Sequence, residues 1–470
     1  MKKDSPFALY GRLVKESKNQ IPLFVLCTLI SGSAFFLIFS SVGVLLTQVV
    51  SMATNEAGTE SMKKVVVYLL AIVAFALFSG FSLAGFIYIE QKVQSKLRAK
   101  MINSYLHTTE HTAEIYPAAE ILNRINYDLP ETVKLIGYTI SGWIFQPMIS
   151  GLFSIILLVY VNWSVAILCI LCTAINMLIM QFAAGRLQRL NADITERKSD
   201  VIRFMQECLA GATELRTFKL FSFLNQKLDI KLSGVSNAIM RFKHYDSLRW
   251  ACMVFFADGF TIIALLVLGA LLDSYGYIHF ADILLAVPLS DQIGQMMTAF
   301  SYFPALIKQG SPNMQRVFSI IDLPQEETDK KSDIVQTFRS ILFQDISFSY
   351  GKQQILNKLS FQIKAGEKVA FIGESGSGKS TIIKLLLGLY MPNSGVIALG
   401  DQTLEGSSLS EWRKNFAYMP QETSMFHLTI EENISLSTDA DTEEVNIAAR
   451  KANAEQFILQ SSGGYKTFIG

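Results

Sequence analysis

The sequence predicts an all-α polytopic membrane domain of six transmembrane helices, followed by an α/β domain. Half of the 470 residues are hydrophobic and only 17% are charged, whereas roughly a quarter are charged in soluble domains. Six stretches are apolar over the about 20 residues that a spanning helix needs. After Ile320 the chain becomes polar, and strand-like and helix-like segments then follow in succession, as in α/β domains.

The six predicted spans are long, apolar and nearly free of charge. They cover approximately Leu23–Val50, Val65–Ile89, Leu135–Tyr160, Ser164–Ala184, Trp250–Leu272 and Ile283–Ile307. Only the turn at Asn162 and Trp163 separates the third from the fourth, so these two form a hairpin. The first span follows a basic segment and is too long for a signal-peptide core, which indicates a retained span.

Charge predicts the orientation of these spans. Lys and Arg gather in the N-terminal segment and in the loops after the second and fourth spans, whereas the turn at Asn162 has neither. The positive-inside rule then places both termini and both long loops in the cytoplasm of a multi-pass protein of the cell inner (cytoplasmic) membrane. These loops have helical periodicity, so we expect the helices to continue beyond the membrane.

The chain therefore divides into three parts. Residues 1–320 form the transmembrane domain with its cytoplasmic helical extensions, 321–340 a polar linker, and 341–470 the first part of a nucleotide-binding domain. In this last part ILFQDISFSY, LSFQIK and KVAFI are strand candidates, and TIIKLLLGL is a helix candidate.

One motif within residues 341–470 predicts a specific binding site. The segment GESGSGKST matches G-x-x-x-x-G-K-[ST] between a strand candidate and a helix candidate, which predicts a P-loop NTPase domain that binds ATP and Mg²⁺. Its glycines let backbone N–H groups face phosphate oxygens, and the following helix adds its positive end. Lys379 would reach the β and γ phosphates, and Ser380 would ligate Mg²⁺. The predicted contacts are Gly373, Glu374, Ser375, Gly376, Ser377, Gly378, Lys379, Ser380 and Thr381.

With these features the whole chain resembles an ABC exporter half-transporter, a six-span domain fused to an ATP-binding cassette. In FSYGKQQIL the resemblance places Tyr350 where the family stacks an aromatic ring on adenine, although Tyr350 could also be an ordinary strand aromatic. In YMPQE it places Gln421 as a second Mg²⁺ contact that also senses the membrane domain. The segment MFHLTIEENI matches the family's next conserved stretch after that glutamine. EILNRINYDLPETV and ECLAGATELRTFKLF resemble the regions that couple the two domains.

The resemblance also implies partners. Family members of this shape act as dimers, so we expect a second half-transporter subunit, identical or different, together with the lipid bilayer and no nucleic acid. It implies ATP-driven export of a substrate, whose identity the sequence does not predict.

The sequence departs from the family pattern near its end. The closing segment GYKTFIG matches the opening of a stretch that in the family leads to LSGGQ, an apolar strand ending in paired acids, and a switch histidine. These 470 residues contain none of the three, so no catalytic residue is assigned and we expect little hydrolysis by this chain alone. A fragment of an exporter explains this, and so does a short ATP-binding, non-hydrolysing regulatory or structural subunit. An importer is disfavoured because importers usually keep the two domains on separate chains.

Four acidic or amide side chains lie within the last two predicted spans. Asp258 belongs to the fifth span, and Asp291, Gln292 and Gln295 to the sixth. Ionisable groups inside a membrane are functional candidates, here for lining a substrate path. The alternative is hydrogen bonding between helices that fixes their packing.

Overall fold

The computed structural model describes residues 5–53, 59–326, 340–421, 423–436 and 441–469. It forms two compact units, residues 1–108 with 112–325 and residues 109–111 with 326–470. The first is helical and the second contains the sheets, which confirms the predicted fold class.

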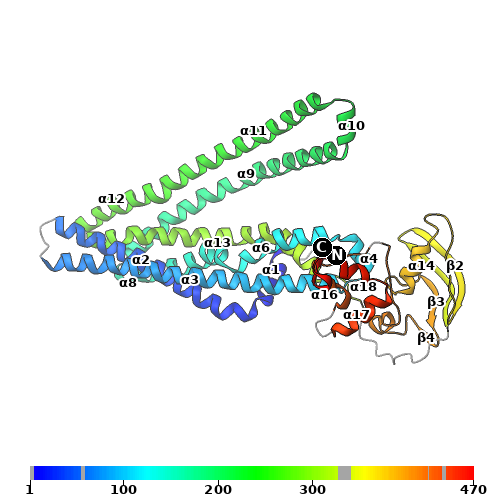
Figure 1. Cartoon of the computed structure of the whole chain (residues 1–470). Helices are drawn as coiled ribbons and strands as arrows, with labels where there is room; N and C mark the ends of the chain where they lie inside the picture. The colour runs from blue at the N-terminus through cyan, green and yellow to red at the C-terminus, as the bar shows by residue number, and fades with distance from the viewer. Residues whose placement is uncertain (1–4, 54–58, 327–339, 422, 437–440, 470) are drawn as a thin grey trace. The chain divides into compact units, whose positions relative to one another are not determined.

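The helices of the first unit are mostly long, and several are apolar (Figure 1). Short 3₁₀ or π segments interrupt the chain between them. The α-helices are α1 Pro6–Glu16, α2 Ile21–Ala53, α3 Thr59–Leu106, α4 Glu110–Ile115, α5 Ala118–Asn123, α6 Leu129–Val133, α7 Tyr138–Ile140, α8 Gln146–Val161, α9 Trp163–Ala210, α10 Ala212–Thr217, α11 Phe221–Val254, α12 Thr261–Ser274 and α13 Phe280–Ile321. The first two residues of α4 belong to the second unit. The interruptions are η1 Lys18–Gln20, η2 Arg124–Asp128, η3 Lys134–Ile136, η4 Ser141–Phe145 and η5 Phe255–Phe260.

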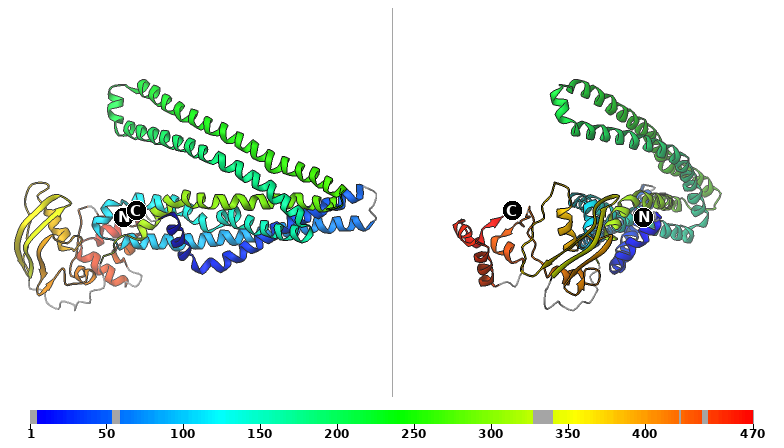
Figure 2. Two further views of the ribbon diagram at one scale, coloured as in Figure 1. Left: turned by 180° about the vertical axis from the view of Figure 1, so that it is seen from behind. Right: turned by 90° about the vertical axis from the view of Figure 1, so that its right-hand side faces the viewer.

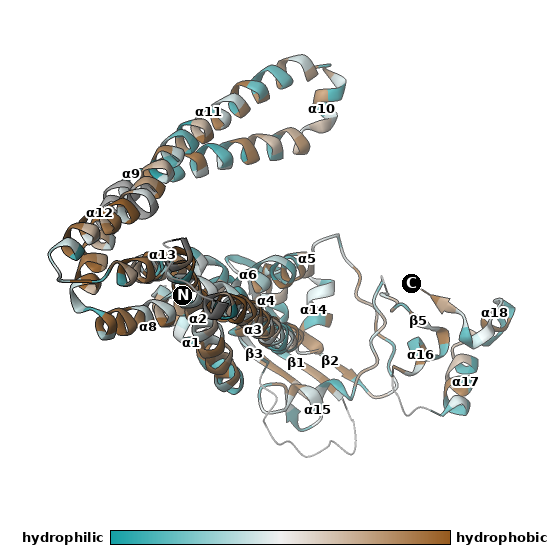
Figure 3. Cartoon of the chain, turned by 90° about the vertical axis from the view of Figure 1, so that its left-hand side faces the viewer, coloured by the Kyte–Doolittle hydropathy of each residue, from teal (hydrophilic) through white to brown (hydrophobic). Residues whose placement is uncertain are grey.

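Among the described residues, three helical segments are long and apolar enough to cross a membrane. They are Lys18–Val50, Met62–Leu106 and Tyr138–Val161, and two shorter apolar helices cover Trp163–Ile175 and Thr261–Ser274. Large apolar side chains on their outer faces are exposed, such as Phe81 at 78%. Figure 3 shows the brown, apolar colouring along these helices. Such faces suit the apolar interior of a lipid bilayer. The bilayer offers no hydrogen-bond partners, and a helix needs none because it satisfies its backbone hydrogen bonds internally.

The predicted hairpin at Asn162 is confirmed. Helix α8 ends at Val161, and the Asn162 side chain caps α9 by accepting a hydrogen bond from the Ser164 backbone N–H at 3.0 Å. A side chain that accepts from the first free N–H groups is the usual start of a helix. Helix α9 then runs without a break to Ala210, and α10 turns the chain back into α11, so that the distal ends of α9 and α11 project from the other helices (Figure 1, Figure 2).

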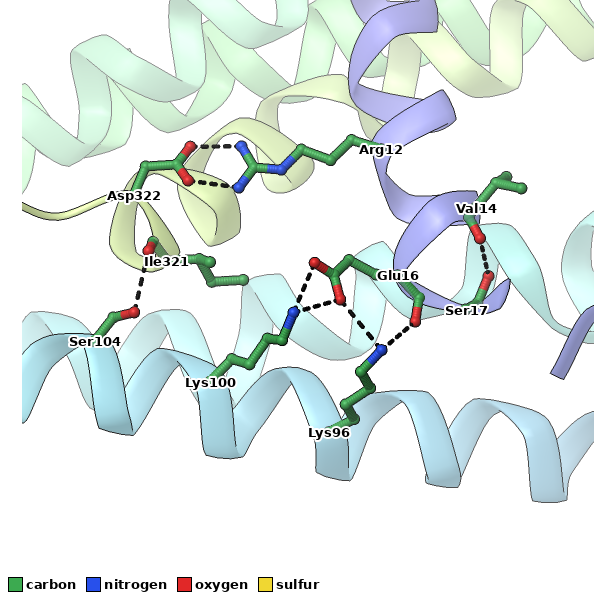
Figure 4. Close-up of polar contacts among 9 residues, drawn as sticks. All are labelled: Arg12, Val14, Glu16, Ser17, Lys96, Lys100, Ser104, Ile321 and Asp322. Atoms are coloured by element: carbon green, nitrogen blue, oxygen red, sulfur yellow. Dashed lines mark hydrogen bonds and ion pairs between the residues drawn. The ribbon is translucent and has the colours of Figure 1, made fainter. Parts of the chain in front are cut away.

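The N-terminal helix α1 is held to α3 and to the end of α13 by ion pairs (Figure 4). The Arg12 guanidinium donates to both carboxylate oxygens of Asp322 and lies 4.3 Å from the Phe318 ring centroid. Nζ of Lys100 lies 2.7 Å from a Glu16 carboxylate oxygen. Partial burial acts to raise the pKa of Glu16, but the hydrogen bonds from Lys100 and Lys96 outweigh it and hold that pKa below its ordinary value.

The second unit is built on a four-stranded antiparallel sheet of order β2-β1-β3-β4. Strands β1 and β2 form a hairpin that pairs Tyr350 with Gln353, and Gly351 adopts φ +57° in the two-residue turn between them. The elements are β1 Ser340–Tyr350, β2 Gln353–Lys364, α14 Lys379–Leu386, β3 Ser394–Leu399, β4 Gln402–Thr403, α15 Leu409–Arg413, β5 Leu428–Thr429, α16 Ile430–Ser435, α17 Thr442–Lys451, α18 Glu455–Gln460, η6 Gly464–Lys466 and β6 Phe468–Ile469.

The prediction of a strand at KVAFI is wrong for this structure. Residues 367–374 have no regular secondary structure, and Val369 and Ile372 are 49% and 95% exposed. A strand forms only when a neighbouring strand accepts its hydrogen bonds, and parallel strands need cover on both faces. Among the described residues no strand pairs with KVAFI, although its Phe371 packs on the core under β1 and β2.

Candidate functional site

The glycine-rich loop connects the irregular KVAFI segment to α14, and its backbone takes conformations that need glycine. Gly376 has φ +86° and Gly378 φ +92°. A Cβ on Gly378 would also lie 2.9 Å from a Leu356 side-chain atom. L-residues rarely adopt such angles. The loop therefore has the tight, exposed backbone that phosphate binding requires, with Glu374, Ser375 and Ser377 at its surface.

The Lys379 side chain folds back over this loop. Its Nζ donates to the backbone oxygens of Gly373 at 2.9 Å and Glu374 at 2.7 Å, and lies 3.4 Å from Oγ of Ser377. These are hydrogen bonds from a charged donor to the carbonyls of a surface turn. The ammonium group is thus held above the loop, where it can exchange carbonyl oxygens for phosphate oxygens of higher charge.

Helix α14 begins at Lys379 directly after the loop, as predicted. Ser380 is exposed, and its hydroxyl makes no hydrogen bond among the described residues, so it can serve a metal ion. Thr381 is buried at 6% exposure, and Ile382 and Leu385 anchor the helix in the core. The first turn of α14 therefore points free backbone N–H groups toward the loop while its far face is fixed.

The other end of α14 is held by a contact that sequence reasoning missed. Trp412 of α15 is 1% exposed and donates from Nε1 to the Leu386 oxygen at 2.7 Å. Arg413 donates to the oxygens of Leu387 and Gly388 and forms a two-pronged ion pair with Glu326 at 2.7 and 2.9 Å. The last carbonyls of a helix lack internal partners, so these donors complete it. Nothing in the local pattern around WRKNF signals this long-range contact.

The two site residues taken from the family resemblance differ in their surroundings. Tyr350 ends β1 and is half-buried, with its ring edge-to-face against Phe348 at 4.8 Å and Tyr390 at 5.1 Å. Gln421 is exposed in an irregular segment, and among the described residues no hydrogen bond joins it to residues 373–381. Stacking of Tyr350 on adenine and Mg²⁺ contact by Gln421 stay predictions.

The four candidate residues of the fifth and sixth predicted spans lie in different environments. Asp291 and Gln295 are half-buried and share one face of α13, where Nε2 of Gln295 donates to Asp291 at 2.7 Å. Gln292 is fully buried, and neither atom of its amide has a partner in the described part of the chain. Asp258 lies in the π-helical segment η5, and its side chain is outside the described residues.

Comparison with known proteins matches both units. Residues 21–297 match the family described as the ABC transporter transmembrane region, and residues 356–468 match the ABC transporter domain. The chain is 26% identical over 398 residues to the "ATP-dependent permease MDL1" of Candida albicans, and 27% over 385 residues to a "Probable ABC transporter ATP-binding/permease protein" of Haemophilus influenzae. It is 25% identical over 399 residues to an "ATP-dependent lipid A-core flippase" of Chromohalobacter salexigens.

Each of these three alignments covers 81% of this chain. The chain spans 57%, 69% and 66% of the length of the three relatives, respectively.

Proposed function

Because the chain belongs to the ABC transporter family, we propose that it is one half of a dimeric exporter that moves a substrate across a cytoplasmic membrane by binding ATP. One observation carries the proposal: a single chain joins apolar helices of membrane-spanning length to a loop on which Lys379 is held above Gly373 and Glu374. A cation on a glycine-rich loop at a helix N-terminus suits the phosphates of a nucleotide.

In this proposal each part of the loop has a distinct role. The backbone N–H groups of 373–378 and the start of α14 hold phosphate oxygens, and the Lys379 ammonium supplies the compensating charge. Ser380 would hold Mg²⁺ together with Gln421, and the ion would neutralise charge between phosphates. Tyr350 would place the adenine ring. ATP can drive a conformational change of the dimer only if it binds one arrangement of the dimer more tightly than the other.

A second subunit is supported by the α9–α11 hairpin. Its distal part exposes large apolar side chains, among them Leu209 at 74%, Phe218 at 68% and Phe221 at 54%. Apolar groups in a region of polar helix indicate a surface that a partner covers. We propose that a second half-transporter, identical or different, covers it.

The substrate path is proposed to run along the face of α13 that carries Asp291 and Gln295. In a variant whose native cysteines are replaced by alanine, we expect Asp291→Cys and Gln295→Cys to react with a membrane-impermeant maleimide in proteoliposomes. Gln292→Cys, at a fully buried position, is the matched control and should react slowly. Equal protection at all three positions, with and without ATP, would favour the packing interpretation instead.

The second candidate is a subunit that binds ATP without hydrolysing it. The contacts of Lys379 support phosphate binding, whereas phosphoryl transfer depends in addition on groups that position metal and water. Expressed as these 470 residues, the chain should bind a fluorescent ATP analogue and release phosphate only at the background rate. Steady turnover that a Lys379→Ala variant loses would contradict this expectation and favour the exporter acting alone.

A further inference from the structure

A pocket of about 400 Å³ lies between α9 and α11, far along the chain from the nucleotide loop. It is lined by two guanidinium groups, an imidazole, a phenol and two apolar side chains. These are Arg186, Arg241, His244, Tyr245, Leu190 and Met240. Its volume is in the range of small-molecule sites, and its lining combines cations with an apolar wall.

The cations of the pocket are available for an anionic ligand. The Arg186 guanidinium lies 5.3 Å from the Tyr245 ring centroid, which orients it without neutralising its charge. Nε of Arg241 donates to the Asn237 oxygen at 3.4 Å, a long hydrogen bond within the same helix. Within the described part of the chain, neither guanidinium forms an ion pair with a carboxylate.

The acidic side chains nearest in sequence to Arg186 and Arg241 already form ion pairs with other residues. Asp246 lies 2.8 Å from Arg249, and Asp193 lies 2.8 Å from Arg197. Both pairs join residues one helical turn apart on the same helix. The carboxylates therefore do not cancel the positive charge of the pocket, which two guanidiniums present to solvent.

The pocket lies where the two helices change from polar to apolar. Arg186 comes just after Ala184, the end of the fourth predicted span, and Tyr245 comes shortly before Trp250, the start of the fifth. Figure 3 shows α9 and α11 turning from teal near α10 to brown toward α12. Phospholipid headgroups occupy this level of a bilayer, and long basic side chains reach them from helix ends.

We propose that this pocket binds the phosphate headgroup of an anionic phospholipid. Arg186 and Arg241 provide planar donors that can hold phosphate oxygens in pairs, as guanidinium groups do. Leu190 and Met240 provide an apolar wall for the glycerol and the first acyl carbons. A free phosphate would use only the cations, whereas a lipid uses both parts of the lining, so the lipid is the ligand that the pocket fits. Transport and ATP binding are not needed for this site.

The test uses the full chain in nanodiscs of phosphatidylcholine with phosphatidylglycerol, followed by native mass spectrometry to count retained phosphatidylglycerol. In the Arg186→Gln/Arg241→Gln variant we expect affinity for the tightest-bound molecule to fall roughly tenfold to thirtyfold, as the loss of two interfacial cations implies. Arg216→Gln/Lys219→Gln is the matched control, because it removes two exposed cations at the far end of the hairpin. The control should retain the lipid.

A second variant keeps the test valid if the double substitution harms folding. Met240→Trp fills the pocket and removes no charge, and we expect it to release the same lipid. Equal loss in the control, or retention in both pocket variants, would overturn the proposal. Binding of inorganic phosphate is measured separately in lipid-free detergent. If phosphate binding depended on Arg186 and Arg241 but phosphatidylglycerol binding did not, the proposal would also be overturned.

Discussion

Lys379→Ala is expected to weaken ATP binding by about a hundredfold or more. The Lys379 ammonium is the cation held over the loop, donating to the oxygens of Gly373 and Glu374. Hydrogen bonds that involve a charged group contribute about 1.5–3 kcal/mol each, so the loss of two to phosphate oxygens accounts for this factor. Alanine is a good helix former, so α14 should remain intact.

The matched control is Lys384→Ala on the same helix. Lys384 lies in the last turn of α14, at the end opposite the loop, and its Nζ lies 5.5 Å from the Tyr390 ring centroid. Titration with a fluorescent ATP analogue, with and without Mg²⁺, should separate the two variants. If Lys379→Ala bound ATP within about threefold of the parent, the assignment of this loop as the phosphate site would be wrong.

Trp412→Ala is expected to destabilise the second unit by about 3–5 kcal/mol, the usual cost of truncating a buried aromatic side chain. Trp412 is 1% exposed, packs with Leu404, Leu409 and the other core residues, and donates to the Leu386 oxygen at 2.7 Å. The substitution leaves both a cavity and an unpaired helix carbonyl. Because α14 directly follows the glycine-rich loop that we propose holds phosphate, ATP affinity should fall together with stability.

Two further variants separate the loss of packing from the loss of the hydrogen bond and from the effect of a surface substitution. Trp412→Phe keeps most of the packing and loses only the donor, so it should cost about 1–3 kcal/mol. Glu411→Ala removes a surface ion pair between α15 and Lys414, the residue that follows the helix, and should lower the stability by well under 1 kcal/mol. Limited proteolysis of the full chain, with fragments assigned to residues 340–469, measures all three. A Trp412→Ala chain as resistant as Glu411→Ala would contradict the role given to this contact.

The helix at TIIKLLLGL and the strand predicted at KVAFI show which elements a short stretch of sequence can predict. The helix formed as predicted because its hydrogen bonds lie within the segment and its apolar face meets the core through Ile382 and Leu385. The strand did not form because its hydrogen bonds must come from another segment, and the sheet of order β2-β1-β3-β4 does not supply one. Local sequence contains the information for the first and not for the second.

Local sequence by itself determined the tight glycine-rich loop at 373–378, the hairpin at Asn162 and the apolar helices. Each depends on backbone conformation, capping or hydropathy over neighbouring residues, as at Gly378 and Asn162. Tertiary structure alone decided that Arg12 meets Asp322, that Trp412 closes α14, and that Arg186 and Arg241 share one pocket. These residues are far apart in the chain, and only the packing of whole helices and sheets brings their side chains into contact.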